Sequence, residues 1–374
     1  MTKKVIVLGT GLVGSAIAMD MSKKYETHAV DINPDSFQQL KKHYVHTKQA
    51  DLSDPETLIE LVSDFDLVIG ALPGHFGYKT LETIIRSGKN IVDISFMPED
   101  FMNLDSLAKE YNVTAVVDCG VSPGMGNLIL GYHNHTMEVE HFTCYVGGLP
   151  LVREWPFEYK AVFSPIDVIE EYTRPARFVK NGNIVEKEAL SDIEIIHFEK
   201  VGPLEAWNSD GLRSLLKTMT IPNMIEKTLR FPGTTEYIKV LRDSGFFSYE
   251  EVDIKGHKIR PIDMTARLLF PKWQLKPGEG DFTVMQIAIS GKENNQQAEY
   301  VYTLYDEFEP SSGILSMSRT TGYTCTAVAD LILNDLFHKP GICPPEFIGE
   351  NEKNYMCILE YLKKRNVNYK KEKK

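Results

Sequence analysis

The chain has 374 residues, with 41 Lys and Arg against 52 Asp and Glu, which gives a formal net charge of −11. At about 150 residues per domain, this length predicts two or three domains. The hydrophobic share of 43% is ordinary for globular proteins and excludes collagen-like or extended disordered chains. The acidic balance argues against a nucleic-acid partner, because Lys and Arg supply the affinity for phosphates.

The cysteines and the apolar runs indicate a reduced, soluble protein. The five cysteines show no CxxC spacing, so we expect free thiols and no metal site. No third ligand lies in register with His133 and His135, so we expect no metal site at this pair either. No apolar run approaches the ~18 residues of a membrane span, and the N-terminus lacks a signal-peptide pattern. We therefore expect a cytoplasmic protein with no membrane partner.

The first 120 residues alternate strand-like and helix-like stretches, which predicts βαβ units and a parallel sheet. Helices are expected over residues 15–24 and 98–111, after Asn33-Pro34, and after a capping box that joins Ser53 to Glu56. Six strands are expected, over residues 4–8, 28–32, 66–71, 90–94 and 114–118, with one more ending near residue 50. This pattern predicts a Rossmann-type doubly wound domain.

After residue 138 the aromatic and β-branched content rises, which predicts a second α/β domain with a largely antiparallel sheet. Its strands are expected over residues 141–146, 193–198, 284–290 and 299–306, and its helices over 166–172 and 234–243. An apolar helix over 321–337 should pack back on the first domain, and the basic end should be a solvated tail. The predicted boundaries are 1–130 with 318–350, then 131–317, then 351–374.

A glycine-rich loop follows the first predicted strand. Gly9 permits the tight turn, Gly11 lets a pyrophosphate approach the backbone, and Gly14 lets helix and strand pack closely. Asp31 would accept hydrogen bonds from both ribose hydroxyls, and no Arg follows it within residues 32–34, so NAD is favoured over NADP. The other predicted cofactor-binding residues of this loop are Thr10, Leu12 and Val13.

Ligands of doubly wound domains bind beyond the carboxyl ends of the parallel strands. The residues at those ends are therefore expected to complete the cofactor site. They are Asp51, Leu52, Ala71, Leu72, Pro73, Asp93, Gly120 and Val121.

Three stretches carry a more specific pattern: DCGVSPGMGN at 118–127, YVGGLP at 145–150 and EYKAVFSP at 158–165. With further blocks at 202–206, 227–230 and 317–321, they resemble the saccharopine dehydrogenase family. The resemblance implies an N-terminal Rossmann domain and a central domain that binds substrate and forms a homodimer or higher homo-oligomer. It is greatest to the branch that oxidises the ε-amine of L-lysine with NAD. That reaction gives allysine, which cyclises to a piperideine carboxylate, and ammonia.

Two alternatives remain open. One is a saccharopine reductase or another oxidoreductase of the family that acts on a diamine or polyamine; saccharopine reductases typically use NADPH. The more distant one is an NAD-sensing regulator without catalysis. Ser122 stands where saccharopine reductases carry an acidic residue, which disfavours the first alternative.

The matching blocks and the strand ends supply the candidate catalytic and substrate-binding residues. Asp93 or Glu158 is expected to contact the ε-amine, with Tyr159 as an orienting group. Arg230 and Arg319 are candidates for the substrate carboxylate, because a guanidinium binds carboxylates bidentately. The remaining candidates for the small amino-acid substrate are Ser95, Phe96 and Ser122. Cys119 is expected to be a buried residue rather than a catalytic thiol.

Overall fold

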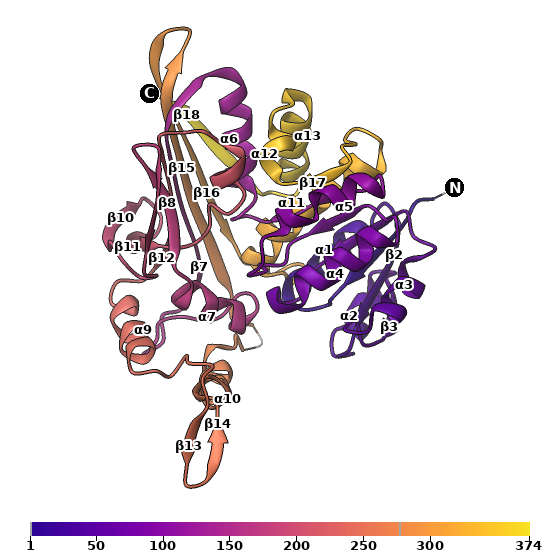
Figure 1. Cartoon of the computed structure of the whole chain (residues 1–374), viewed down its shortest axis with the longest axis horizontal. Helices are drawn as coiled ribbons and strands as arrows, with labels where there is room; N and C mark the ends of the chain where they lie inside the picture. The colour runs from indigo at the N-terminus through magenta and orange to yellow at the C-terminus, as the bar shows by residue number, and fades with distance from the viewer. Residues whose placement is uncertain (1, 277) are drawn as a thin grey trace. The chain divides into compact units, whose positions relative to one another are not determined.

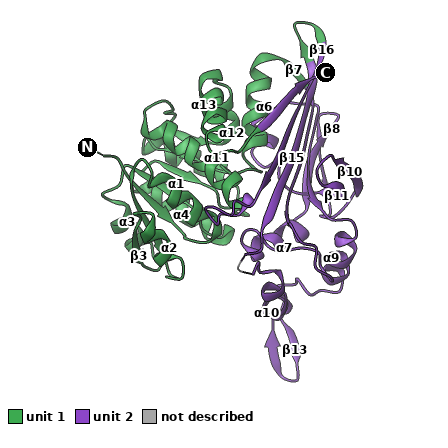
Figure 2. Cartoon of the chain, turned by 180° about the vertical axis from the view of Figure 1, so that it is seen from behind, with its two compact units in different colours: residues 1–139, 292–296, 317–368 green, residues 140–291, 297–316, 369–374 purple. Residues whose placement is uncertain are grey.

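The computed structural model describes residues 2–276 and 278–374, which form two compact units (Figure 2). Unit 1 contains the residues up to 139, together with 292–296 and 317–368. Unit 2 contains 140–291, 297–316 and 369–374. The chain therefore returns to unit 1 after unit 2, and residues 351–368 cluster with unit 1 rather than forming a separate segment.

Unit 1 is built on a seven-stranded parallel sheet with the strand order β17-β6-β5-β4-β1-β2-β3 (Figure 1). Without β17 this is the 3-2-1-4-5-6 order of doubly wound dinucleotide-binding folds, so the predicted fold class is confirmed. The seventh strand was missed by the sequence reasoning because its three residues follow unit 2 in the chain, outside the strand–helix alternation that revealed the equally short β5 and β6. The strands are β1 (Lys4–Leu8), β2 (Glu26–Asp31), β3 (His46–Gln49), β4 (Leu67–Gly70), β5 (Ile91–Asp93), β6 (Thr114–Val116) and β17 (Gly341–Cys343).

The helices of unit 1 begin at different residues from those predicted. α3 is capped by Asp54, whose carboxylate accepts from the backbone N–H groups of Glu56 and Thr57, so the predicted Ser53 capping box was wrong. An aspartate directly before Pro55 was the better N-cap, since proline suits the first helical position. The helices are α1 (Leu12–Met21), α2 (Phe37–Lys42), α3 (Pro55–Val62), α4 (Gly74–Arg86), α5 (Asp105–Glu110), α6 (Met125–Thr136), α11 (Ser316–Leu333), α12 (Pro345–Gly349) and α13 (Glu352–Lys363), with a 3-10 turn η1 (Phe101–Leu104).

Unit 2 contains a nine-stranded mixed sheet, whose main path is β10-β11-β12-β7-β15-β16-β18, with β8 and β9 attached through β12. Pairing between β12 and β7 is parallel, while β11 with β12 and β16 with β18 are antiparallel. Its main-sheet strands are β7 (Glu138–Pro150), β8 (Ala176–Lys180), β9 (Asn183–Lys187), β10 (Glu194–Phe198), β11 (Gly202–Asn208), β12 (Asn223–Arg230), β15 (Asp281–Glu293), β16 (Gln296–Glu307) and β18 (Tyr369–Lys373).

The helices of unit 2 lie between its strands, and α9 spans residues 234–243 as predicted. A separate two-stranded hairpin, β13 with β14, projects beyond α10 (Figure 1). These remaining elements are α7 (Pro165–Thr173), α8 (Leu215–Thr218), α9 (Thr234–Asp243), β13 (Val252–Ile254), β14 (His257–Ile259) and α10 (Pro261–Trp273).

The basic C-terminus is not the solvated tail that its composition predicts. Its last strand, β18, pairs with β16 from Tyr300↔Lys373 to Leu304↔Tyr369. Exposed lysines are compatible with both states: Tyr369 is partly buried and the residues after it are exposed, a composition that also suits an edge strand. Within residues 2–276 and 278–374, none of the helices has the length and hydropathy needed to cross a membrane.

Candidate functional site

The glycine loop between β1 and α1 is closely packed at two glycines and open at the third. Gly9 has φ +99°, and a Cβ there would overlap the carbonyl oxygen of Ala71. A Cβ on Gly14 would in turn overlap the carbonyl oxygen of Gly9, so helix and loop touch through backbone alone. Around the position that a Cβ on Gly11 would take, no described residue other than its chain neighbours lies within 4 Å. This space gives room for a ligand's phosphate.

The amino end of α1 has the geometry of an anion site. Gly11 is its N-cap, and no side chain caps the first turn. Leu12 is half exposed, Val13 is partly buried and Thr10 is buried, so the loop presents backbone rather than bulky side chains at this end. The N–H groups of a first helical turn, with the helix dipole behind them, favour phosphate oxygens. These residues could hold a dinucleotide pyrophosphate.

Asp31 at the end of β2 is fixed to this loop. Its Oδ2 accepts from the Thr10 backbone N at 2.6 Å and from Thr10 Oγ1 at 3.2 Å, and its Oδ1 accepts from Asn33 N at 2.9 Å. Ser36 Oγ donates to Thr10 Oγ1 at 2.8 Å, a contact that the sequence reasoning missed. Ser36 ends the polar turn DINPDS (31–36), the signal that could have indicated this contact. The carboxylate is thus oriented before any ribose binds.

The ends of β3 and β4 differ in what they can offer a cofactor. Ala71, Leu72 and Pro73 are partly buried directly after β4, where the Ala71 N–H donates to Leu8 O at 2.8 Å. Asp51 is exposed after β3, and its hydrogen bonds to Ser53 lower its carboxyl pKa. Leu52 belongs to the hydrophobic core of unit 1, and its place beside the adenine stays a prediction.

Asp93 at the end of β5 is buried among strand ends. The Ser95 N–H donates to its Oδ1 at 2.7 Å, and Ser95 Oγ lies 3.3 Å from its Oδ2. A Cβ on Gly70 would overlap this carboxylate, so the glycine that ends β4 makes room for it. Phe96, next along the chain, is partly buried. The Asp93 carboxylate therefore contacts the ends of both β4 and β5. Because this carboxylate is buried, it could exchange a proton with a substrate amine through a neighbouring hydroxyl such as that of Ser95.

The loop after β6 is shaped by backbone contacts. Gly120 N donates to Pro123 O at 3.1 Å across a cis Ser122–Pro123 peptide, and Gly124 has φ +145°. Asn127 Oδ1 accepts from Gly124 N at 3.2 Å and caps α6, a role that the sequence reasoning missed although Asn127 ends the DCGVSPGMGN motif. Val121 is buried. The loop is held rigid from both of its ends.

Two predicted substrate contacts, Tyr159 and Arg230, lie instead in the aromatic core of unit 2. Arg230 Nε donates to Tyr172 Oη at 3.2 Å, and its Nη2 donates to Glu171 Oε2 at 2.8 Å. The guanidinium also lies 4.5 Å from the Tyr159 ring centroid, and Tyr159 meets the Trp273 ring edge-on at 5.6 Å.

This packing gives both residues structural partners in unit 2, and their predicted substrate roles stay predictions. The Nε–Nη2 edge of Arg230, the edge that would clamp a carboxylate, is already occupied. Burial raises the pKa of the Tyr159 phenol, while the charge of Arg230 opposes that rise. Motif membership could not distinguish a core cation from a ligand-binding cation.

Glu158 and Arg319 also have partners within their own units. Glu158 has φ +49° and pairs with Arg153, whose Nε lies 2.9 Å from Glu158 Oε2. Arg319 Nη2 donates to Arg365 O at 3.0 Å, so it anchors the C-terminal segment of unit 1. Asp93 is the only one of the three predicted catalytic residues that lies in the unit carrying the glycine loop.

A Rossmann unit with a prepared dinucleotide loop, followed by a mixed-sheet unit, defines a two-domain dehydrogenase architecture. Residues 5–116 match the family model described as Saccharopine dehydrogenase NADP binding domain, and residues 117–367 match the Saccharopine dehydrogenase C-terminal domain. The chain belongs to the saccharopine dehydrogenase family of oxidoreductases. The predicted family is thereby confirmed.

Curated relatives and a solved structure agree with this family. The saccharopine dehydrogenase [NADP(+), L-glutamate-forming] of Pyricularia oryzae is 28% identical over 67% of this chain and 59% of its own length. The alpha-aminoadipic semialdehyde synthase of Arabidopsis thaliana is 27% identical over 55% of this chain and 21% of its own length. The matches thus span little more than half of the first relative and about a fifth of the second.

The apo saccharopine dehydrogenase (L-Glu forming) of Saccharomyces cerevisiae superposes with a TM-score of 0.78, with 20% identity and full coverage of both chains. At this identity the match establishes the fold. Two of these three names contain saccharopine dehydrogenase, one of them with NADP(+), and none of the three concerns lysine 6-dehydrogenase.

Proposed function

We propose that this protein is an NAD-dependent dehydrogenase of the lysine 6-dehydrogenase type, which oxidises the ε-amine of L-lysine to allysine and releases ammonia. The observation that carries the cofactor choice is Asp31, a carboxylate fixed beside the glycine loop by Thr10 and Asn33. Allysine would then cyclise to a piperideine carboxylate.

Electrostatics at the end of β2 support NAD. The residues that follow Asp31 are Ile32, Asn33, Pro34, Asp35 and Ser36, which include a second carboxylate and no cation. A 2′-phosphate here would face like charge, whereas the ribose hydroxyls of NAD can donate to Asp31. The proposal thus departs from the NADP(+) specificity in the names of the curated relatives.

The choice of lysine over saccharopine rests on the β6 loop and on the family resemblance. Ser122 stands where saccharopine reductases carry an acidic residue, so an anchor for the larger diamino substrate is missing. The alternative substrates are saccharopine and other diamines or polyamines. Turnover, rather than fold, decides between them.

The glycine loop and Asp31 would hold NAD, which would supply the hydride acceptor for Cε, and the protein would orient the amine and remove a proton from it. Ser95 would accept an amine proton at Oγ while its own hydroxyl proton moves to Asp93 Oδ2, 3.3 Å away. Water then adds to the resulting imine, and ammonia leaves. Asp93→Asn should reduce kcat, and Ser95→Ala should reproduce that loss; normal rates in both variants would remove this relay.

The deciding experiment follows NADH or NADPH absorbance with lysine, ornithine, saccharopine and putrescine. We expect turnover of lysine with NAD; activity with saccharopine alone, or with NADP alone, would overturn the proposal. Dinucleotide binding without turnover of any of these amines would indicate a sensor instead. We further propose that the protein is a homo-oligomer, which light scattering during gel filtration would test.

The cofactor choice has its own variant. Asp31→Ser combined with Ile32→Arg should raise kcat/KM with NADP relative to NAD by at least about tenfold, because it replaces repulsion of the 2′-phosphate by a cation. Asp64→Ser, at an exposed carboxylate between α3 and β4, is the matched control and should leave the ratio unchanged. An unchanged ratio in the double variant would contradict the role of Asp31.

A further inference from the structure

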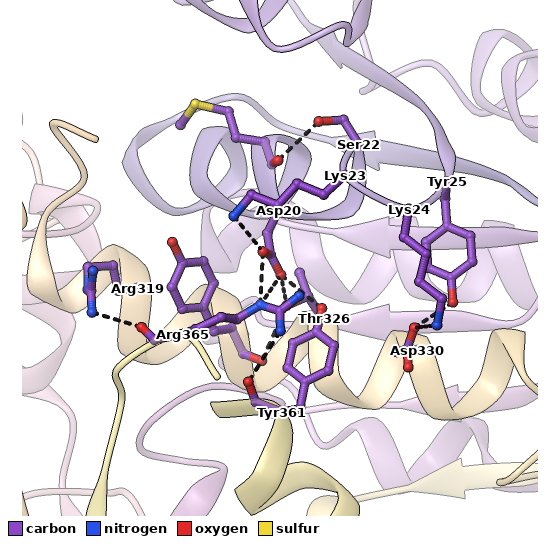
Figure 3. Close-up of polar contacts among 12 residues, drawn as sticks. Asp20, Ser22, Lys23, Lys24, Tyr25, Arg319, Thr326, Asp330, Tyr361 and Arg365 are labelled. Carbon is purple, nitrogen blue, oxygen red and sulfur yellow. Dashed lines mark hydrogen bonds and ion pairs between the residues drawn. The ribbon is translucent and has the colours of Figure 1, made fainter. Parts of the chain in front are cut away.

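Asp20, near the carboxyl end of α1, has a fully buried carboxylate that four other residues bind (Figure 3). Arg365 Nε lies 2.9 Å from Oδ1 and 2.8 Å from Oδ2. Tyr361 Oη and Thr326 Oγ1 each donate to Oδ2 at 2.8 Å. Lys23 Nζ lies 3.2 Å from Oδ1. We call Asp20, Thr326, Tyr361 and Arg365 the Asp20 cluster.

A carboxylate at this place is unfavourable unless it is paired. The carboxyl end of a helix carries negative partial charge, which repels an anion. Burial adds a desolvation cost that only hydrogen bonds and an opposite charge can offset. Burial and the charge of Asp20 raise the pKa of Tyr361, so its hydroxyl keeps the proton that it donates. The cluster is therefore a fixed attachment of α1 to the C-terminal residues of unit 1.

The same cluster completes a line of contacts along α1. A Cβ on Gly322 of α11 would lie 3.2 Å from Ile17 Cγ1, so the two helices approach closely there. One turn further along α11, Thr326 reaches Asp20, and after another turn Asp330 accepts from Lys24 Nζ at 2.6 Å. Helix α1 is thus held at its middle by α11, at its carboxyl end by the cluster, and at its amino end by the Gly9 contact.

We propose that Asp20 is a positioning residue for the dinucleotide: it fixes the direction of α1, and through α1 the N–H groups of the first turn. The inference rests on the proposed dinucleotide binding at that turn. Eight residues separate Leu12 from Asp20, or about 12 Å along a rigid helix, so a tilt released at one end displaces the other. Through their bonds to Asp20, Arg365 and Tyr361 connect the C-terminal segment of unit 1, remote in sequence, to cofactor affinity.

The test measures NADH binding by fluorescence titration, together with KM for NAD, kcat and the thermal midpoint. Variants are Asp20→Asn, which removes the charge, and Tyr361→Phe, which removes one hydrogen bond and preserves the ring. Asp330→Asn is the matched control, because Asp330 of α11 is a partly buried carboxylate that pairs with Lys24, which lies beyond Met21, the last residue of α1. Hydrogen exchange of the α1 amides reports on the helix itself.

We expect Asp20→Asn to weaken NADH binding and raise KM for NAD by about tenfold, with kcat within about twofold of the wild type. Tyr361→Phe should produce a smaller change in the same direction, and Asp330→Asn none. NADH affinity equal to wild type in both Asp20→Asn and Tyr361→Phe, even with a lowered midpoint, would reduce the cluster to a stability device and overturn the inference. Wild-type protein that binds no dinucleotide would instead refute the proposed function.

Discussion

Replacing Arg230 with methionine should destabilise unit 2 severely, because it leaves Glu171 without its cation. Arg230 is almost fully buried and donates to Tyr172, to Leu229 O at 2.9 Å and to Glu171. Removing one partner of a buried pair costs about 3–5 kcal/mol. At about 2–4 °C per kcal/mol for a domain of 150–250 residues, the thermal midpoint should fall by roughly 6 to 20 °C.

The assay is thermal unfolding followed by circular dichroism, with Arg260→Met as the control. Arg260 forms an exposed pair with Asp263, so its loss should leave the thermal midpoint close to that of the wild type. Burial raises the pKa of Glu171 and Arg230 opposes that rise, so the variant should bind a proton at Glu171 more readily. Its deficit should therefore shrink as the pH falls toward the ordinary glutamate value of 4.5.

A normal thermal midpoint for Arg230→Met, combined with a raised KM for the amino-acid substrate, would refute this reasoning. That result would restore Arg230 as a ligand for the substrate carboxylate.

Three further predictions concern other parts of the chain. Gly14→Ala should weaken NADH binding and cost about 1–3 kcal/mol of stability, because its Cβ overlaps Gly9 O; an unchanged titration would contradict this packing. Burial and Glu194 raise the pKa of Tyr145 from 10.0 to about 12, so the folded state binds the phenol proton more tightly than the unfolded state. The free energy of unfolding should therefore fall as the pH rises from 10 to 12. Tyr145→Phe should remove that part of the pH dependence measured by urea unfolding. A thiol reagent should modify one cysteine of the native protein rapidly, the exposed Cys357, and Cys357→Ser should abolish that reaction; rapid reaction of the buried thiols would contradict the packing.

The dinucleotide unit was predictable because its requirements are local. A tight turn, a close helix approach and an acidic strand end each need particular residue types at fixed spacing, and Gly9, Gly14 and Asp31 all occupy the expected structural places. Strand β17 was not predictable, because its three residues carry no periodicity and lie outside the strand–helix alternation that revealed the equally short β5 and β6. Its pairing with β6 depends on the chain returning to unit 1 after unit 2.

The substrate residues were less predictable because burial is a tertiary property. Arg230 lies in a motif block and has the right chemistry for a carboxylate, yet Glu171 and three aromatic rings surround it. Sequence spacing between residues 171 and 230 gives no sign of that contact. The basic C-terminus shows the same limit, since its composition matches both a solvated tail and an edge strand.

Buried and partly buried arginines in this chain join segments that are distant in sequence. Arg230 ties β12 to α7, and Arg365 ties the end of α13 to α1, in each case through a carboxylate on a helix. Arg319 extends the second connection by donating to the backbone carbonyl of Arg365. A motif match at such a residue therefore has two physical explanations, contact with a ligand or the pairing of a buried carboxylate. Replacing a ligand-binding arginine should raise KM with little loss of stability, whereas replacing the partner of a buried carboxylate should lower stability with little change in KM. Measuring both quantities in one variant therefore separates the two roles, which loss of activity alone would not do.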